Sequence, residues 1–132
     1  MTNEPKSLES KLILVADDEP DIVNIVEIIL KSKGYGVLKA ANGLEALELA
    51  ERYNPDLILL DIMMPDMDGW EVLRLLSVDP STAGIPVAMI SAKTSSRAKI
   101  ASMQEGAVDY ITKPFDSHEL LSKVREILAD RS

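Results

Sequence analysis

The chain has 132 residues, of which 46% are hydrophobic, enough for one compact domain with an apolar core but too few for a second domain. Its 22 acidic and 14 basic residues give a net charge of −8, which argues against nucleic acids and anionic membranes as ligands. The absence of cysteine excludes disulfides and thiolate metal sites. No apolar run approaches the roughly 18 residues of a membrane span, and the first residues lack a signal-peptide pattern, so we expect a soluble, cytoplasmic protein.

Strand and helix patterns alternate along the chain after a polar lead-in at residues 1–10, which we expect to be disordered. Apolar runs predict strands at residues 11–16, 35–40, 55–61, 85–90 and 108–112. Helical periodicity predicts helices at residues 20–34, 44–53, 69–76, 95–105 and 116–128. The expected domain covers residues 11–129, and residues 130–132 form a short tail.

The apolar runs do not alternate with polar residues, which is typical of strands that are covered on both faces. Strands that alternate with helices form parallel pairs through right-handed crossovers, with helices on both faces of the sheet. The sequence therefore predicts an α/β fold with a doubly wound parallel sheet.

Several residues mark the ends of the expected helices. Pro20 suits the first helical position, where its missing N–H is not needed. Ser95 or Ser96 can cap the fourth helix, and Asp116 with Glu119 forms a capping-box pattern at the last one. The fourth helix is only weakly apolar, so we expect it to be exposed. The residues at core spacing in the second helix are Leu44, Leu47 and Ala50.

Chemically useful side chains follow the expected strands. Asp17 and Asp18 follow the first strand, Asp61 ends the third, Ser91 ends the fourth, and Lys113 follows the fifth. The carboxyl ends of parallel strands are where ligands bind, so we expect these groups to converge. Clustered carboxylates need a counter-charge, and Mg²⁺ prefers such oxygen ligands while keeping waters that a phosphate can displace.

This pattern resembles the receiver domain of two-component response regulators, the CheY-like family. The resemblance covers residues 11–129 and rests on four segments in order: ADDEP at 16–20, LLDIMMPDMDG at 59–69, ISAK at 90–93 and GAVDYITKPF at 106–115. It implies a flavodoxin-like (βα)5 fold in which the strand order is 2-1-3-4-5.

The resemblance assigns the phosphoacceptor role to Asp61, with a sensor histidine kinase or a phosphotransfer protein as the donor. It implies that Asp18 and Asp61 bind Mg²⁺ (or Mn²⁺) directly. The backbone carbonyl of Met63 would be the third protein ligand, and Asp17 would act through a coordinated water.

The resemblance also assigns roles to residues around the phosphoryl group. Ser91 and Lys113 would hold its oxygens, and the peptide bond between Lys113 and the following proline would be cis. Tyr110 would be the aromatic switch that responds to Ser91. Met63 and Lys93 would flank the path of the attacking water and so tune the phosphate lifetime.

The implied output is a change on the face formed by the fourth helix, the fifth strand and the fifth helix, which would bind a downstream protein target. The sequence is compatible both with a monomer and with a phosphorylation-dependent homodimer. The domain would not be an enzyme beyond its own phosphotransfer and dephosphorylation. Both a stand-alone regulator and a receiver within a longer protein fit the sequence.

Two other functions fit the sequence less well than a phosphorylated receiver. A pseudo-receiver that only binds partners is disfavoured because the complete set of site residues is present: Asp17, Asp18, Asp61, Ser91 and Lys113. An aspartyl phosphatase would need an acid two residues after its nucleophile, where this chain has Met63. The segment at 66–69 lacks the acids of a calcium loop and is better explained as a turn.

Overall fold

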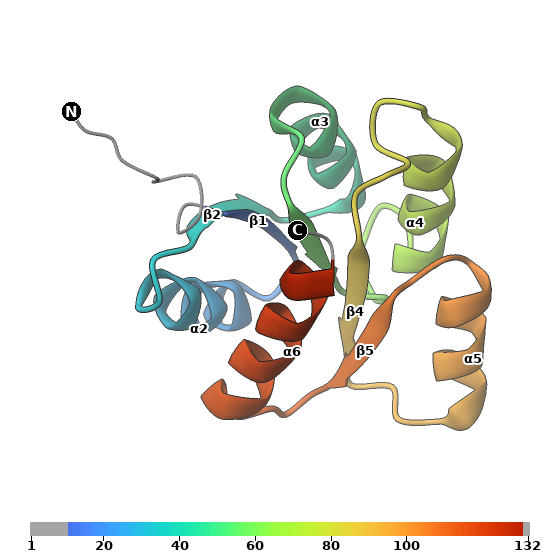
Figure 1. Ribbon diagram of the computed structural model, residues 1–132. Helices are drawn as coiled ribbons and strands as arrows, with labels where there is room; N and C mark the ends of the chain where they lie inside the picture. Colours follow the sequence, from blue (N-terminus) through green and yellow to red (C-terminus); the bar gives the residue numbers. More distant parts are fainter. Residues whose placement is uncertain (1–10, 131–132) are drawn as a thin grey trace.

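The computed structural model describes residues 11–130, which form a parallel sheet between two layers of helices (Figure 1). The predicted lead-in at 1–10 and the last two residues of the predicted tail lie outside the described residues. The strands are β1 (Leu12–Ala16), β2 (Gly36–Ala40), β3 (Leu57–Leu60), β4 (Val87–Ser91) and β5 (Asp109–Thr112). The helices are α2 (Pro20–Lys31), α3 (Gly43–Tyr53), α4 (Gly69–Val78), α5 (Ser96–Gln104) and α6 (Ser117–Asp130).

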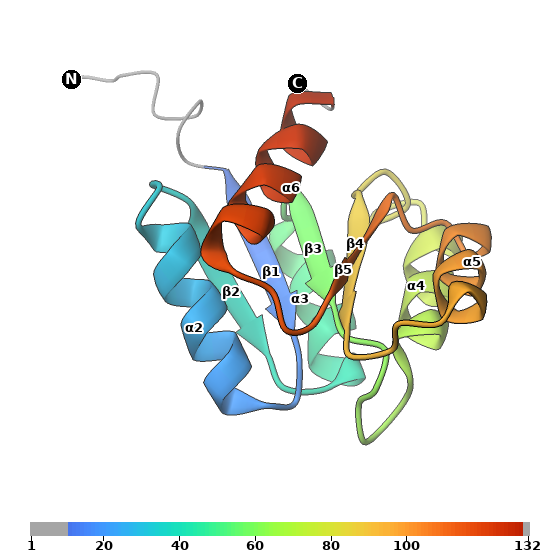
Figure 2. The ribbon, with the colours of Figure 1, turned by 90° about the horizontal axis from the view of Figure 1, so that it is seen from below.

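The strands are ordered β2-β1-β3-β4-β5 and every pair is parallel, which confirms the predicted α/β class and strand order. Figure 2 shows the strand arrows running in one direction between the helices. Ala16 lies in register with Leu60, and Ser91 with Thr112. The residues that follow these strands therefore meet at one edge of the sheet.

Each face of the sheet has its own apolar core. One core packs α2 and α6 against the sheet and includes Val26, Leu120 and Val124, which are buried completely. The other packs α3 and α4 against the opposite face. Both faces of β3 are therefore covered, as its apolar run without alternation predicts.

The caps confirm much of the predicted segmentation. The Ser95 side chain accepts a hydrogen bond from Ala98 N at 3.1 Å and caps α5. Asp116 and Glu119 each accept a backbone N–H from the other, at 2.8 and 3.0 Å, which is the predicted capping box. The observed α4 and α6 end two residues later than predicted, at Val78 and Asp130, so α6 extends into the predicted tail.

One predicted core residue is wrong. Leu44 is 56% exposed, whereas Ala50 in the same helix is buried. Leu44 belongs to the first turn of α3 and follows Gly43, which packs against Met67. Helical spacing gives the face of a helix but not how far the neighbouring elements cover it.

Helix α5 differs from the other helices, as its weak apolar pattern predicts. Its buried residues are Ala98 and Ser102, while Ile100 and Met103 are exposed. Within residues 11–130, no helix combines the length and the hydropathy that crossing a membrane requires.

Candidate functional site

Two buried carboxylates lie at the carboxyl edge of the sheet, next to each other on neighbouring strands. Asp17 directly follows β1 and Asp61 directly follows β3, and their exposed fractions are 3% and 4%. Backbone bonds continue the sheet through both residues, from Asp17 N to Ala40 O at 3.0 Å and from Asp61 N to Ala16 O at 2.9 Å. The ends of the strands therefore fix the backbone positions of both residues.

Lys113 reaches this pair from the loop between β5 and α6. Its ammonium Nζ lies 2.8 Å from Asp17 Oδ2, 2.9 Å from Glu19 Oε1 and 3.4 Å from Asp61 Oδ2. Its backbone N–H donates to Ser91 O at 2.8 Å, and its peptide bond to Pro114 is cis, as expected. One cation thus contacts three carboxylates that come from two different strand ends.

The charges of this cluster do not balance. The pKa of Asp61 is raised to about 6: burial is the largest cause, the negative charge of Asp17 acts in the same direction, and Lys113 opposes both. Burial disfavours the charged form of Lys113, but its hydrogen bonds to Asp17 and Glu19 raise its pKa above the ordinary value. When all four groups are ionised, the negative charge exceeds the positive charge, and a divalent cation would correct this imbalance.

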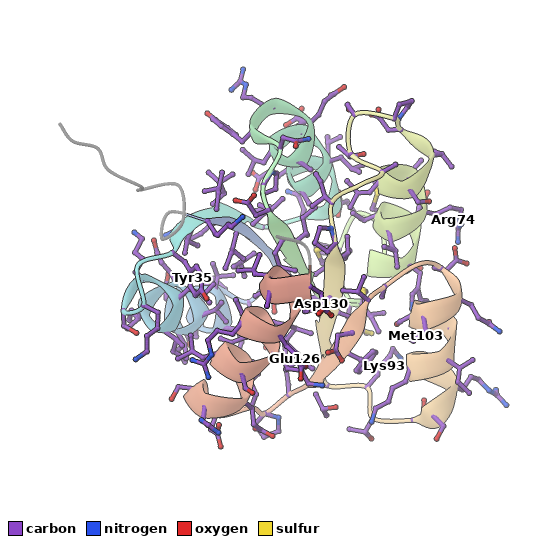
Figure 3. All side chains as sticks on the ribbon, in the orientation of Figure 1. Tyr35, Arg74, Lys93, Met103, Glu126 and Asp130 are labelled. Atoms are coloured by element: carbon purple, nitrogen blue, oxygen red, sulfur yellow. The ribbon has the colours of Figure 1, made fainter. Side chains whose placement is uncertain are left out.

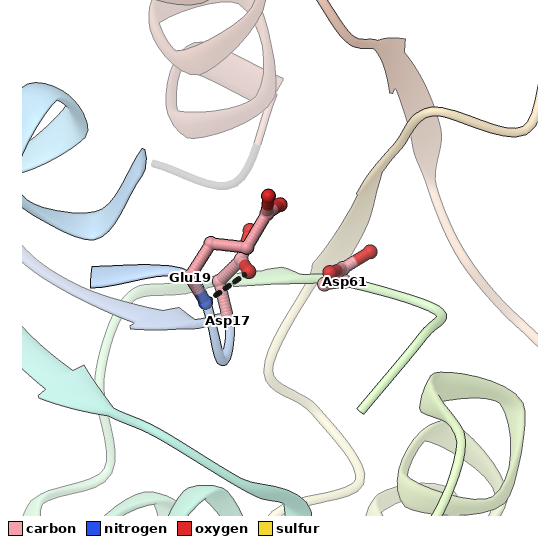
Figure 4. A group of neighbouring side chains, drawn as sticks. All are labelled: Asp17, Glu19 and Asp61. Carbon is pink, nitrogen blue, oxygen red and sulfur yellow. Dashed lines mark hydrogen bonds between the residues drawn. The ribbon is translucent and has the colours of Figure 1, made fainter. Parts of the chain in front are cut away.

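The carboxylates also have the chemistry of a metal site. Asp17, Glu19 and Asp61 each offer an oxygen, and these atoms lie within 4.8 Å of one another (Figure 4). Hard oxygen donors with excess negative charge suit Mg²⁺. The residues that are present therefore fit a divalent cation.

The carboxylates that lie together differ in one residue from the acids expected from the sequence. Glu19 was not predicted as a ligand, although it stands in the acidic run at 17–19, and its N–H donates to Asp17 Oδ1 at 3.0 Å. Asp18 is exposed and is not part of this cluster; it lines a neighbouring hollow with Asp17 and Lys39. The structure thus brings Asp17, Asp61 and Lys113 together as predicted, but leaves Asp18 beside them.

Three further predicted site residues, Ser91, Lys93 and Tyr110, form a second group on the β4 side. Ser91 is fully buried at the end of β4, and its Oγ accepts a hydrogen bond from Lys93 N at 3.2 Å. The hydroxyl of Tyr110 donates to Lys93 O at 2.7 Å. Figure 3 places Lys93 in the connection between β4 and α5. Tyr110 and Ser91 are thus linked through the backbone of a single loop residue.

The loop between β3 and α4 passes directly beside Asp61. Met63 N donates to Asp61 Oδ1 at 3.3 Å, and the Met63 side chain is exposed. Gly69 N donates to Ile62 O at 2.7 Å, and a Cβ at Gly69 would collide with the backbone of Asp61. This position therefore requires glycine, because α4 begins against the backbone of Asp61.

The fold and this edge define a class of protein: an α/β domain of flavodoxin-like strand order with a buried aspartate at the carboxyl end of its central strand. The family model for the response regulator receiver domain matches residues 13–125, which marks the chain as a signalling module rather than a classical enzyme. The chain belongs to the response regulator receiver family, which confirms the resemblance drawn from the sequence. Its acidic pocket of Asp17, Glu19 and Asp61 is consistent with a phosphoacceptor site.

Curated relatives agree with this membership. The chain is 45% identical over 116 residues to the DNA-binding dual master transcriptional regulator RpaA of Synechocystis sp., covering 88% of this chain and 48% of that protein. It is 38% identical over 117 residues to protein PilH of Pseudomonas aeruginosa, covering 89% of this chain and 97% of that protein. The chain thus spans about half the length of RpaA and nearly all of PilH.

Solved structures show the same fold. The receiver domain of the Francisella response regulator 1452 matches with a TM-score of 0.87 and 33% identity, over 93% of this chain and 100% of that one. The chemotaxis protein CheY4 of Vibrio cholerae matches with a TM-score of 0.85 and 30% identity, over 89% and 98%. A receiver domain implies a histidine kinase partner.

Proposed function

We propose that this chain, with residues 11–129 as its receiver domain, is a cytoplasmic phosphorylation switch that accepts a phosphoryl group on Asp61. The donor is the phosphohistidine of a sensor histidine kinase or of a phosphotransfer protein. The observation that carries the proposal is a buried carboxylate of raised pKa at a strand end, 3.4 Å from the ammonium of Lys113.

In the transfer, a carboxylate oxygen of Asp61 attacks the phosphorus of the phosphohistidine. The new O–P bond forms as the N–P bond breaks, and the imidazole leaves with the electron pair and takes up a proton. Lys113, now shared among three carboxylates, binds the phosphoryl oxygens, and Ser91 adds a hydroxyl hydrogen bond. Water later attacks the phosphorus, which releases phosphate and restores the Asp61 carboxylate.

The proposed metal site consists of the carboxylates of Asp18 and Asp61, the backbone carbonyl of Met63, and Asp17 acting through a water. Bound Mg²⁺ or Mn²⁺ would supply positive charge opposite the phosphoryl oxygens. Asp18 and Glu19 are both exposed, and Lys113 contacts Glu19 as it contacts Asp17 and Asp61, but no ion pair within residues 11–130 involves Asp18. Asp18 can therefore bind a cation without giving up a contact with Lys113. This difference favours Asp18 over Glu19 as a ligand.

Phosphorylation would change the surface formed by α5, β5 and α6. A phosphoryl group on Asp61 attracts Ser91, whose hydroxyl now accepts the Lys93 N–H. Tyr110 bonds the same loop residue, so a shift of this loop alters the position of the ring. The altered face would bind a downstream protein target or a second copy of the chain. Met63 and Lys93, both exposed, would tune how fast water reaches the phosphate.

The test is the intact mass of the protein after incubation with acetyl phosphate, with Mg²⁺ and with excess chelator. One phosphate adduct that needs Mg²⁺ is expected in the wild type and in Asp56→Asn, and none in Asp61→Asn. Asp56 is a matched control because it precedes β3 at the opposite edge, where its Oδ2 accepts Leu12 N at 2.8 Å. An adduct that persists in Asp61→Asn, or no adduct in a wild type that binds Mg²⁺, would contradict the proposal and favour a pseudo-receiver.

The ligand set is tested by Mg²⁺ titration of two neighbouring variants, Asp18→Asn and Glu19→Gln. We expect the loss of Asp18 to weaken Mg²⁺ binding about 10-fold or more, since a direct ligand is removed, and the loss of Glu19 to weaken it less. The reverse order would make Glu19 the ligand, in agreement with the cluster it forms with Asp17 and Asp61.

A further inference from the structure

One side chain of the loop that follows Asp61 joins this loop by hydrogen bonds to another part of the fold. Within residues 11–130, the hydrogen bonds of residues 62–68 otherwise stay in the loop, reach back to Asp61, or begin α4. The exception is Asp66, whose Oδ1 accepts Gly43 N at 2.8 Å and whose Oδ2 accepts Leu44 N at 2.9 Å. Asp66 therefore joins the acceptor loop to the start of α3.

The partners of Asp66 are backbone donors that have no acceptor within their own helix. The first N–H groups of any helix lack a partner in the helix, and the positive end of the helix dipole favours a carboxylate there. Both bonds hold the pKa of the Asp66 carboxyl below its usual range. The two oxygens bind two adjacent N–H groups, which restrains the orientation of the carboxylate as well as its position.

The helix has its own cap, so its start does not depend on Asp66 alone. Asn42 accepts the N–H of Glu45 at 2.9 Å, and the Glu45 carboxylate accepts Ala41 N at 2.8 Å. Helix α3 thus has a side-chain cap of its own and packs on the core through Ala46 and Ala50. Because α3 is held independently of Asp66, the contact restrains the loop rather than the helix.

Packing beside Asp66 supports the same arrangement. A Cβ at Gly43 would collide with the Met67 side chain, so the loop approaches α3 as closely as glycine permits. Met67 is partly buried against the core that α3 and α4 share. The loop is therefore seated on the start of α3 by one apolar and one charged contact on adjacent residues.

We propose that Asp66 is a positioning residue, which holds the acceptor loop on α3 and thereby fixes the Met63 backbone carbonyl beside Asp61. The part that concerns metal binding rests on the proposed function, in which that carbonyl is a metal ligand. Asp66 touches neither the metal nor the phosphoryl group; it acts through the backbone of residues 62–68. Residues that orient metal ligands in this way change metal affinity about 10- to 100-fold when they are removed.

The test compares Asp66→Ala with Asp79→Ala by Mg²⁺ titration calorimetry and by amide hydrogen exchange. Asp79 is a matched control: it is another aspartate whose carboxylate accepts a backbone N–H and a hydroxyl from Ser81, both at 2.9 Å, but it follows the far end of α4. We expect Asp66→Ala to weaken Mg²⁺ binding about 10-fold and Asp79→Ala to leave it unchanged. Asp66→Asn, which keeps one acceptor oxygen, should fall between the wild type and Asp66→Ala.

Amide exchange separates this proposal from the proposed function. In Asp66→Ala the amides of Gly43 and Leu44, and those of Met63 and Gly69 in and after the loop, should exchange faster, while those of β3 keep their protection. This result is expected even if the wild type accepts no phosphate. A folded Asp66→Ala protein with wild-type Mg²⁺ affinity, or with unchanged exchange in the loop, would overturn the proposal.

Discussion

Helices α5 and α6 flank the same strand, β5, and follow the two sides of the candidate site, but they are held in different ways. Helix α6 buries a stripe of large apolar side chains, Leu120, Leu121, Val124, Ile127 and Leu128. Helix α5 buries only Ala98 and Ser102 and leaves Ile100 and Met103 in solvent. Helix α6 is therefore held by the apolar core, whereas α5 contacts the rest of the fold through small buried residues.

The same contrast appears in the site residues that lie beside these helices. On the α6 side, Lys113 is fixed by three carboxylates. On the α5 side, Ser91 and Tyr110 are joined to Lys93 by neutral hydrogen bonds. Moving elements are drawn from parts of a fold that open at low free energy, which here is the α5 side. The comparison teaches that one strand can lie between a firmly held helix and a loosely held helix, and the switch proposed at Ser91 and Tyr110 lies on the loosely held side.

The largest expected effect is on the anchored side. Leu120→Ala removes a fully buried side chain of α6 and should lower the free energy of unfolding by about 2–5 kcal/mol. The matched variant on α5 is Ile100→Ala, whose side chain is 56% exposed, and its effect should stay within about 0.5 kcal/mol. Urea unfolding of both variants at one pH measures the difference. Equal losses in the two helices would break the comparison.

The next largest expected effect is the pH dependence of stability that is due to Asp61. The pKa of Asp61 is raised from about 3.8 to about 6 in the folded protein, so the folded state keeps this proton over a range where the unfolded state loses it. The contribution of Asp61 to stability therefore falls as pH rises from about 4 to about 6 and stays low above that range. Asp61→Asn has no charge to bury, so without metal it should be more stable than the wild type by about 1–3 kcal/mol at neutral pH.

Thermal unfolding in chelator, at pH 4 and at neutral pH, measures this linkage. The two proteins should be close in stability at pH 4 and separate as pH rises. Added Mg²⁺ should then stabilise the wild type more than Asp61→Asn. A difference that does not change with pH would show that burial of this charge is not the cause.

The smallest expected change in the free energy of unfolding concerns the contact between α4 and α5. The indole N–H of Trp70, in the first turn of α4, donates to Ser102 Oγ of α5 at 2.9 Å. Arg74 of α4 also pairs with Glu105 at 3.5 Å, on the side where Figure 3 labels Arg74 and Met103. Ser102→Ala leaves the indole donor without its acceptor and should cost about 1 kcal/mol. Hydrogen exchange should become faster in α5 and remain unchanged in α6, and equal acceleration in both helices would contradict the assignment of α5 as the loosely held element.

Much of this molecule follows from local patterns in the chain. Apolar runs without alternation predict a parallel sheet because only a strand covered on both faces has no polar side. The sequence predicts that Asp61 and Lys113 lie close together, because each follows a strand and parallel strands place their carboxyl ends at one edge of the sheet. The capping box of Asp116 and Glu119 is readable because its partners are only three residues apart.

Other features depend on segments that are distant along the chain. Glu19 joins the cluster through Lys113, which is 94 positions away, and Asp66 binds N–H groups 22 and 23 positions away. The exposure of Leu44 likewise depends on how far the neighbouring elements cover the first turn of α3. Periodicity and caps are properties of short segments, so they cannot report these relations.

The sequence by itself determined the fold class, the order of the elements and the strand-end residues from which the site is built. Hydrophobic periodicity and turn residues are properties of short segments, so a single chain carries that information. Only the tertiary structure decided which acids share the charge of Lys113, which helix is loosely held, and which aspartate fastens the acceptor loop. Those relations are set by distances in space between residues that no short-range pattern connects.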